Sequence, residues 1–290
     1  MISIVIISRD EPALNSTLTA LEVQAAASVE PVEVLVVDAS NERLDAIRLA
    51  HSEVRWINFT APAGVRVSIP HQRNAGVAAA NGDIIVFTDA GCLPKAGWLE
   101  QLVAPILAGS ETVTSGIAVS HDGRGLYDIS AKKMAATTYL RECPTICMAF
   151  RRTAFEDVGG FDERFEYGSD IDFSWRLVGA GHKIRHVQRA VVSHDWGTST
   201  RQIGRAYKYG RARARLYRTH LRRLPRLLSD DPVVLIYPLF LLGLPISIRH
   251  RWYPALLLVP AWRSRTERPV AVVVDHLAFG VGVLRELGWP

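Results

Sequence analysis

The stretch Asn81 to Pro94, NGDIIVFTDAGCLP, decides the fold. Its apolar run, Ile84 to Phe87, is short and mostly β-branched, which is typical of a strand buried on both faces in the middle of a parallel sheet. Asp89 follows at the carboxyl end of that strand, where open α/β sheets bind their ligands. An acid in this position predicts a divalent metal that carries a nucleotide diphosphate. The alternative is an Asp that caps the turn after the strand.

Composition allows one large domain, or one domain with an appendage, in 290 residues. Hydrophobic residues make up 48% and the mean hydropathy is +0.09, which is high for a purely soluble enzyme. The net charge of +5 and pI near 9.3 are compatible with nucleic acid, anionic lipid or phosphorylated substrates. Three cysteines predict buried free thiols in a reducing compartment. The opening MISIVIISRD is expected to be a strand and not a signal peptide.

The first part of the chain has the pattern of a nucleotide-binding half. Ile2 to Ile7 and Val32 to Val37 are apolar, β-branched strands, and Leu14 to Ala27 between them is a helix. The chain has no GxGxxG after the first strand, which argues against a dinucleotide enzyme. Asp38 closes the second strand and either binds a ribose or base, or caps a helix together with Ser40.

A further helix is expected from His71 to Ala80. Arg73, near its start, is well placed for a phosphate, because backbone N–H groups and a guanidinium would meet the anion together. The alternative is a solvated surface arginine.

Seven motifs follow one another in an order that resembles family 2 glycosyltransferases of the GT-A fold, over roughly residues 1 to 200. Each motif alone is weak, and their order makes the resemblance specific. The resemblance implies an α/β fold, with a Rossmann-like nucleotide-sugar-binding domain and a mixed, mainly parallel sheet. The motifs are Ser8 to Pro12, VVDAS with Asp38, QRNAG with Arg73, TDAG with Asp89, GGFDERF at Gly159 to Phe165, SDIDFSWRL at Ser169 to Leu177 and AVVSHDWG at Ala190 to Gly197.

The resemblance also implies a donor site. Glu11 and Asp38 match acids that hold the uracil and ribose of a nucleotide sugar, so a UDP-sugar is expected. Arg73 and Asn74 match a basic motif near the base and diphosphate. The residues that it places on the nucleotide sugar are Ser8, Arg9, Glu11, Asp38, Arg73, Asn74, Asp89 and Ala90.

A divalent metal, Mg²⁺ or Mn²⁺, is the cofactor that the resemblance implies. Asp89 matches the first acid of the DxD motif, and Gly91 stands in place of the second, which in the family usually ligates the metal. Asp89 would then act with the diphosphate and water. His194 lies where related enzymes put an additional ligand, and imidazole suits Mn²⁺ better than Mg²⁺. The alternative for His194 is a buried, hydrogen-bonded side chain.

Asp170 matches the general base of the family, in the segment SDIDFSWRL, and Ser169 replaces the Glu that precedes that base. A helix start would lower the pKa of Asp170 and burial would raise it, and the sequence leaves the sign open. Trp175 and Arg176 are candidate acceptor-binding residues. In the alternative, Trp175 belongs to the core and Arg176 pairs with Asp172.

The composition changes after about residue 200. Residues 201–226 hold ten Lys and Arg and no acid, at spacings that predict a basic helix face. Apolar runs follow at 232–248, 252–262 and 270–284. Because a spanning helix needs about 20 apolar residues, these shorter runs predict a membrane-embedded or interfacial helical hairpin. The alternative is a helical subdomain packed on the catalytic core. We therefore expect a catalytic domain over 1–200 and membrane-associated helices over 201–290.

The expected function is inverting transfer of a sugar from a nucleotide sugar to a lipid-linked or cell-envelope glycan acceptor. Basic residues beside the apolar runs predict the cytoplasmic face of the membrane. Nucleic acid is not an expected partner, since no aromatic-rich module accompanies the basic run. Two other functions remain open: a nucleotidyltransferase of similar fold, and a non-catalytic nucleotide-sugar-binding protein, which Gly91 and Ser169 suggest.

Overall fold

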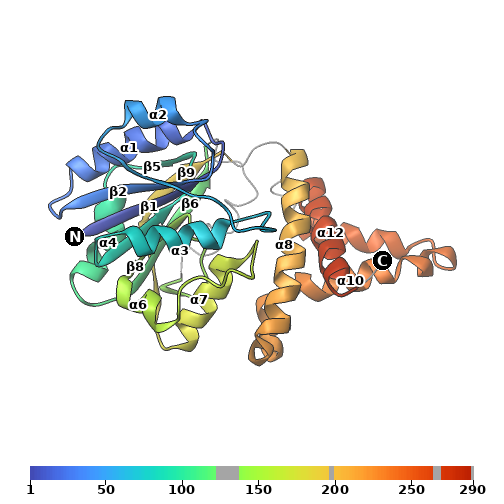
Figure 1. Ribbon diagram of the computed structural model, residues 1–290. Helices are drawn as coiled ribbons and strands as arrows, with labels where there is room; N and C mark the ends of the chain where they lie inside the picture. Colours follow the sequence, from blue (N-terminus) through green and yellow to red (C-terminus); the bar gives the residue numbers. More distant parts are fainter. Residues whose placement is uncertain (122–136, 196–198, 264–268, 289–290) are drawn as a thin grey trace. The chain divides into compact units, whose positions relative to one another are not determined.

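A computed structural model of the chain describes residues 1–121, 137–195, 199–263 and 269–288 (Figure 1). The chain divides into two compact units, Met1–Asp195 and Trp196–Pro290. The sequence placed this boundary after residue 200. The expected glycine-rich loop from His121 to Leu126 lies outside the described residues, apart from His121.

The first unit is built on a nine-stranded mixed sheet with the strand order β3-β2-β1-β4-β8-β6-β9-β5, in which β7 pairs with β9. The strands β1, β2, β3 and β4 run parallel, as their apolar sequences predict, whereas β8 runs antiparallel to both β4 and β6. The sheet consists of β1 (Ile2–Ser8), β2 (Val32–Asp38), β3 (Arg55–Asn58), β4 (Ile84–Thr88), β5 (Cys92–Pro94), β6 (Val113–Ser120), β7 (Tyr139–Leu140), β8 (Cys147–Arg151) and β9 (Ile184–His194).

Helices cover both faces of this sheet (Figure 1). One face carries α3, α6 and α7. A cluster of phenylalanines lies in the core on this face, and the ring centroids of Phe161 and Phe173 are 4.4 Å apart. The other face carries α1 and α4, where Trp98 is fully buried. The helices are α1 (Leu14–Ala26), α2 (Asp45–Ala50), α3 (Ile69–Ala79), α4 (Trp98–Leu107), α6 (Arg152–Asp157) and α7 (Ser169–Gly179).

Two strands differ from what the sequence indicates. The apolar residues from Ala190 to Val192 predict a short strand that ends at Ser193, and in the structure this segment is the end of the longer β9. The polar Gln188 and Arg189 before it are exposed, so β9 lacks a continuous apolar run. The strand β8 was not expected, although it is buried along almost its whole length between β4 and β6. Its sequence, CMAFR, has few β-branched residues, so only tertiary pairing identifies it as a strand.

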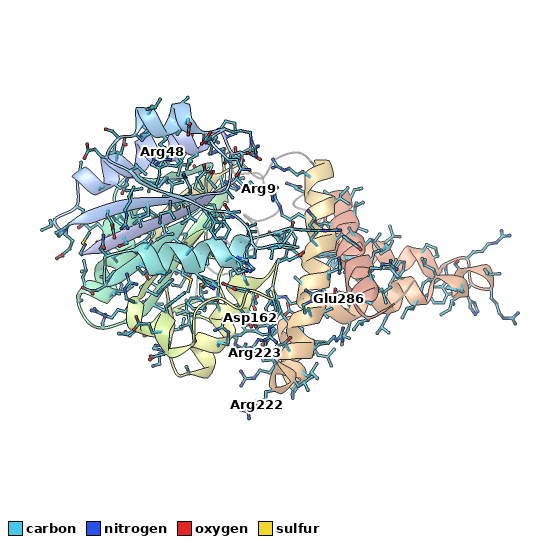
Figure 2. All side chains as sticks on the ribbon, viewed as in Figure 1. Arg9, Arg48, Asp162, Arg222, Arg223 and Glu286 are labelled. Carbon is cyan, nitrogen blue, oxygen red and sulfur yellow. The ribbon has the colours of Figure 1, made fainter. Side chains whose placement is uncertain are left out.

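The second unit is helical. Its long first helix, α8, packs along α12, and glycines at the contact permit a close approach, since a side chain at Gly210 or Gly282 would collide with the backbone of the other helix. The Glu286 side chain, labelled in Figure 2, accepts hydrogen bonds from Arg211 and Arg215 of α8. The elements are α8 (Ser199–Thr219), η1 (Leu221–Arg226), α9 (Leu227–Asp230), α10 (Val233–Leu242), η2 (Leu244–Ile248), η3 (Tyr253–Leu257), α11 (Leu258–Arg263) and α12 (Pro269–Glu286).

The expected basic helix over 201–226 ends earlier, because α8 stops at Thr219 and a 3₁₀ segment follows. Within the described ranges, none of the helices combines the length and the apolar character needed to cross a membrane.

Candidate active site

The site is built at the edge of the sheet where β1, β2 and β4 end. In the parallel register Ser8 pairs with Asp38, and Asp89 directly follows β4. The predicted donor-binding acids therefore come from the carboxyl ends of adjacent strands, where the loops converge. Ser8 is 3% exposed, and its hydroxyl has no hydrogen-bond partner within the protein.

Asp38 is the last residue of β2, and Glu11 lies in the loop between β1 and α1. Asp38 is 8% exposed, and its Oδ1 accepts hydrogen bonds from the backbone N–H and the hydroxyl of Ser40. The next helix, α2, begins only at Asp45 after Leu44, so Asp38 and Ser40 form a local turn and do not cap a helix. Glu11 accepts a bond of 3.2 Å from the Ala13 N–H. Arg9 is exposed and donates to the carbonyl of Arg66 over 3.3 Å (Figure 2). Base and ribose contacts for these three residues stay predictions.

Asp10 was not identified from the sequence, although it joins the loop after β1 to the loop after β2. Its carboxylate accepts two bonds from Arg43, at 2.6 and 2.9 Å, and its N–H donates to Ser40 Oγ at 2.8 Å. The hydrogen bond from Arg43 lowers the pKa of Asp10. Its φ of 56° is in the left-handed region, which Asp tolerates better than most side chains. The only sequence signal for this turn was the polar composition of the loop.

Arg73 is buried, not a solvated surface arginine. It is 7% exposed, and its Nη1 donates to Ser169 Oγ at 3.2 Å. Its guanidinium carbon lies 5.5 Å from the centre of the Phe161 ring, while its Nε has no hydrogen-bond partner within the protein. A buried guanidinium with an unsatisfied N–H suits an anionic ligand such as a phosphate, because that N–H is costly to leave without an acceptor.

Asn74 is engaged differently from the expected diphosphate contact. Its Oδ1 accepts from the Phe161 N–H at 2.9 Å, and its Nδ2 donates to the Phe161 carbonyl at 2.9 Å and to Glu163 at 3.0 Å. Both N–H groups of the amide are therefore used to hold the 159–165 loop against α3. These contacts give the Asn74 amide a positioning role, and its contact with the donor stays a prediction.

Gly91 and His194 are neighbours beside Asp89. Cys92 pairs with His194 across the antiparallel strands β5 and β9, and Cys92 Sγ lies 3.6 Å from His194 Nδ1. A Cβ at Gly91 would be 3.4 Å from His194 Cε1, and the φ of Gly91 is +87°. The imidazole thus lies against the position where the family has its second acid. Gly91 also has a conformation that a side chain would strain.

In the part of the chain that it describes, the structure does not show the predicted metal site. Among the residues that the structure describes, no group of three or more His, Cys, Asp and Glu side chains could hold a metal ion. His194 lies against Gly91, two residues after Asp89. A metal held by Asp89 and His194, with its remaining ligands from a diphosphate and water, stays a prediction. All three cysteines are free and buried, as predicted.

Asp170 is the second residue of α7, and its Oδ1 accepts a bond of 2.9 Å from the Ile171 N–H. Its pKa is raised, mainly by burial and further by the negative charge of Asp89, against the lowering effect of Arg73 and of the backbone N–H groups. Burial therefore decides the sign that the sequence left open. The positive charge of Arg73 and the negative charge of Asp89 both act on the Asp170 carboxylate. The three residues therefore form one electrostatic cluster.

Trp175 and Arg176 follow the packing alternative in place of the acceptor role. Trp175 is 4% exposed, and its Nε1 donates to Glu142 at 2.7 Å. Arg176 donates to Asp172, four residues earlier, at 2.8 Å and to the Val158 carbonyl. The indole face is packed inside the protein, so a sugar has no access to it in this structure.

A segment that the sequence did not single out lies between the two halves of the site. The Cys143 N–H donates to Ser174 Oγ of α7 at 3.2 Å, and the chain then enters β8, where Cys147 pairs with Thr88. The segment thus connects the helix of Asp170 with the strand of Asp89. Between these two points, Thr145 is 1% exposed and its hydroxyl has no partner within the protein.

With this geometry established, the comparisons identify the class. The chain belongs to glycosyl transferase family 2, whose model matches residues 3–159. The family and the transferase class expected from the sequence are confirmed, and so is the GT-A fold.

Two curated relatives differ in the products that their names mention. A pre-mycofactocin glycosyltransferase of Mycobacterium tuberculosis is 29% identical over 74% of this chain and 49% of its own length. The chain therefore spans about half of that relative. The succinoglycan biosynthesis protein ExoA of Rhizobium meliloti is 26% identical over 95% of this chain and 93% of its own.

A solved structure supports the fold along the chain. The mannosyltransferase PcManGT from Pyrobaculum calidifontis, in complex with GDP-Man and Mn²⁺, covers 99% of this chain and 87% of its own, with a TM-score of 0.76 and 16% sequence identity.

Proposed function

We propose that the protein is an inverting glycosyltransferase that moves a sugar from a nucleotide sugar, expected to be a UDP-sugar, to a lipid-linked or cell-envelope glycan. The observation that carries the proposal is the cluster of Arg73, Asp89 and Asp170 at the carboxyl edge of the sheet. It combines a buried cation for a diphosphate, a carboxylate for a metal and a carboxylate of raised pKa for proton transfer.

The reaction is a single displacement. The acceptor hydroxyl attacks the anomeric carbon from the face opposite the nucleotide, and Asp170 takes its proton. The bond between the anomeric carbon and the diphosphate breaks, and its electron pair leaves with the nucleoside diphosphate. Arg73 stabilises the negative charge on that leaving group through its buried guanidinium. One such displacement inverts the anomeric centre.

Asp89 and His194 are the residues that would hold a divalent metal. Such a metal, when bound, would neutralise charge on the diphosphate. The Mn²⁺ in the complex of PcManGT motivates a test with that ion. The protein supplies few ligands of its own, so metal affinity should depend on the nucleotide.

The acceptor and the location are proposed from a relative's name and from the composition of the second unit. The name of ExoA refers to succinoglycan biosynthesis, which supports a glycan acceptor. The basic, apolar second unit motivates a lipid-linked acceptor used at the cytoplasmic face of the cell membrane.

The experiment is a panel of nucleotide sugars scored by thermal shift, followed by product analysis with the donor that binds. Release of a nucleoside diphosphate, through transfer or slow hydrolysis, is the expected result. Release of pyrophosphate would indicate a nucleotidyltransferase instead. Donor binding with no turnover in the presence of candidate acceptors would favour the non-catalytic alternative.

A further inference from the structure

The second unit presents a large apolar surface on a short helical arm, which we define as residues 233–263. Several apolar side chains of this arm are mostly exposed: Ile248 is 87% exposed, Leu258 68%, Trp262 65%, Leu239 63%, Trp252 60% and Val259 57%. A soluble surface seldom gathers so many large apolar side chains in so short a segment unless something covers them.

The inner side of the arm is well packed, so the exposed side is a defined surface. The rings of Phe240 and Tyr253 stack with centroids 5.2 Å apart, and Tyr253 donates to the Phe240 carbonyl at 3.0 Å. Gly243 leaves room for that tyrosine, because a Cβ there would collide with its hydroxyl. The hydroxyl of Tyr237 lies 3.0 Å from His276 Nδ1 of α12. The arm therefore packs Tyr237, Phe240 and Tyr253 internally and keeps another apolar set, which includes Trp252 and Trp262, outside.

The charges of the arm indicate what covers this surface. Residues 232–263 contain no Asp or Glu, and the exposed Arg249 and Arg251 interrupt the apolar sequence. Arginines beside exposed apolar side chains complement the phosphates of an anionic bilayer. Trp252 and Trp262 are of the residue type that concentrates at the level of lipid headgroups.

The lengths of the elements indicate how the arm meets the bilayer. The described helices include none that could span a membrane, and the arm consists of short α and 3₁₀ segments that each contain a proline. Short apolar segments with arginines between them fit the interfacial plane, with the apolar side chains in the upper acyl region and the arginines at the phosphates.

We propose that the helical arm is an interfacial docking surface for an anionic lipid bilayer, which the chain contacts through Trp252, Trp262 and neighbouring apolar residues, with Arg249 and Arg251 on the headgroups. This inference rests on the proposed function in one respect, since an acceptor held in a membrane gives the attachment its purpose. Interfacial docking would place the enzyme at the surface that holds such an acceptor.

The test is flotation of the full-length chain with vesicles of phosphatidylcholine, with and without phosphatidylglycerol. We expect binding to the anionic vesicles, weakened by salt. Trp252→Ala combined with Trp262→Ala should reduce binding at least about tenfold, and Arg249→Glu combined with Arg251→Glu by a similar factor. The matched control is Val29→Ala with Leu49→Ala, two exposed apolar residues of the first unit, which should bind like the wild type.

A conservative variant guards against effects on folding. Trp252→Phe combined with Trp262→Phe should still float, and the quenching of tryptophan fluorescence by lipids with brominated acyl chains should decrease. Failure of the wild type to bind anionic vesicles, or undiminished binding by the two alanine substitutions, would overturn the proposal. Self-association of the wild type that those substitutions abolish, without any vesicle binding, would overturn it in favour of a second copy of the chain.

Donor binding separates this inference from the proposed function. A thermal shift with the nucleotide sugar that binds should be the same in the wild type and in the arm variants. Loss of vesicle binding with intact donor binding confirms the inference and leaves the proposed function untouched. A chain that floats with vesicles but binds no nucleotide sugar would contradict the proposed function alone.

Discussion

The Nη1 of Arg73, on α3, lies 3.2 Å from Ser169 Oγ, one residue before Asp170 on α7. This contact joins the expected diphosphate-binding residue to the expected base. The family has a Glu at position 169, which would form an ion pair with such an arginine. With serine there, the positive charge of Arg73 is not neutralised by its neighbour and acts on Asp170, whose pKa it lowers against the effect of burial.

The pH dependence of activity follows from that interaction. Arg73→Met removes the cation, so the pKa of Asp170 should rise and the acid limb of kcat/KM should move to higher pH. Arg73→Lys retains the charge and should leave the limb near its wild-type position. The measurement is a pH profile of kcat/KM for the three proteins. Identical acid limbs in the wild type and the methionine variant would show that the charge of Arg73 does not affect the pKa of Asp170.

The amide of Asn74 should contribute more to the free energy of unfolding than to donor binding. Asn74→Ala removes both bonds to the Phe161 backbone and leaves a buried N–H without its acceptor, which should cost about 1–3 kcal/mol in the free energy of unfolding. Denaturant unfolding of the variant measures this cost. The donor Kd should change less than in Arg73→Met. A large loss of donor affinity with unchanged stability would restore Asn74 to the donor site.

Asp275 gives the second unit its own pH dependence. Burial raises its pKa to about 6, against the lowering effect of Arg205. An unfolded Asp titrates near about 3.9, so the folded state binds this proton more tightly and loses stability as pH rises from about 4 to about 6. Asp275→Asn should therefore be more stable than the wild type above pH 6, by about 1–2 kcal/mol, and the difference should vanish below about pH 4.

Thermal unfolding across this pH range measures the effect of Asp275. The exposed Asp83 provides the control, because Asp83→Asn should follow the wild-type curve at every pH. A constant offset between Asp275→Asn and the wild type would mean that packing, not titration, causes the difference.

Metal affinity should depend on the nucleotide. Calorimetric titration with Mn²⁺ is expected to show weak binding to the free protein and tighter binding with nucleoside diphosphate, because the diphosphate supplies oxygens that the protein lacks. Asp89→Ala should remove metal-dependent activity. His194→Ala should weaken Mn²⁺ binding or change the preference between Mn²⁺ and Mg²⁺. Full activity in excess chelator would mean that Arg73 stabilises the negative charge on the leaving group without a metal.

The sequence was most informative where local chemistry decides the structure. The apolar runs of β1, β2 and β4 predicted the parallel half of the sheet, and the acids at their ends predicted the edge where Asp38 and Asp89 lie. The segment SDIDFSWRL likewise placed Asp170 at the start of a helix. A strand buried on both faces and a polar helix start leave signals in the residues themselves.

The missed features depend on contacts between segments distant in the chain. The bonds of Asn74 to the loop at Phe161 and of Cys143 to Ser174 span 87 and 31 residues and have no local pattern. The orientation of Trp175, inward against Glu142, was one of two alternatives that helix periodicity could not separate. The sign of the pKa shift of Asp170 depends on how deeply tertiary packing buries it.

The most direct test of the account is the donor Kd and the transfer rate of Asp170→Asn. The substitution keeps the shape of the side chain and removes its ability to take a proton. We predict that the variant binds the nucleotide sugar with wild-type affinity and that its transfer rate falls by about 10²–10⁴-fold, which is the usual contribution of a general base. Transfer at the wild-type rate would contradict the assignment of Asp170 as the base.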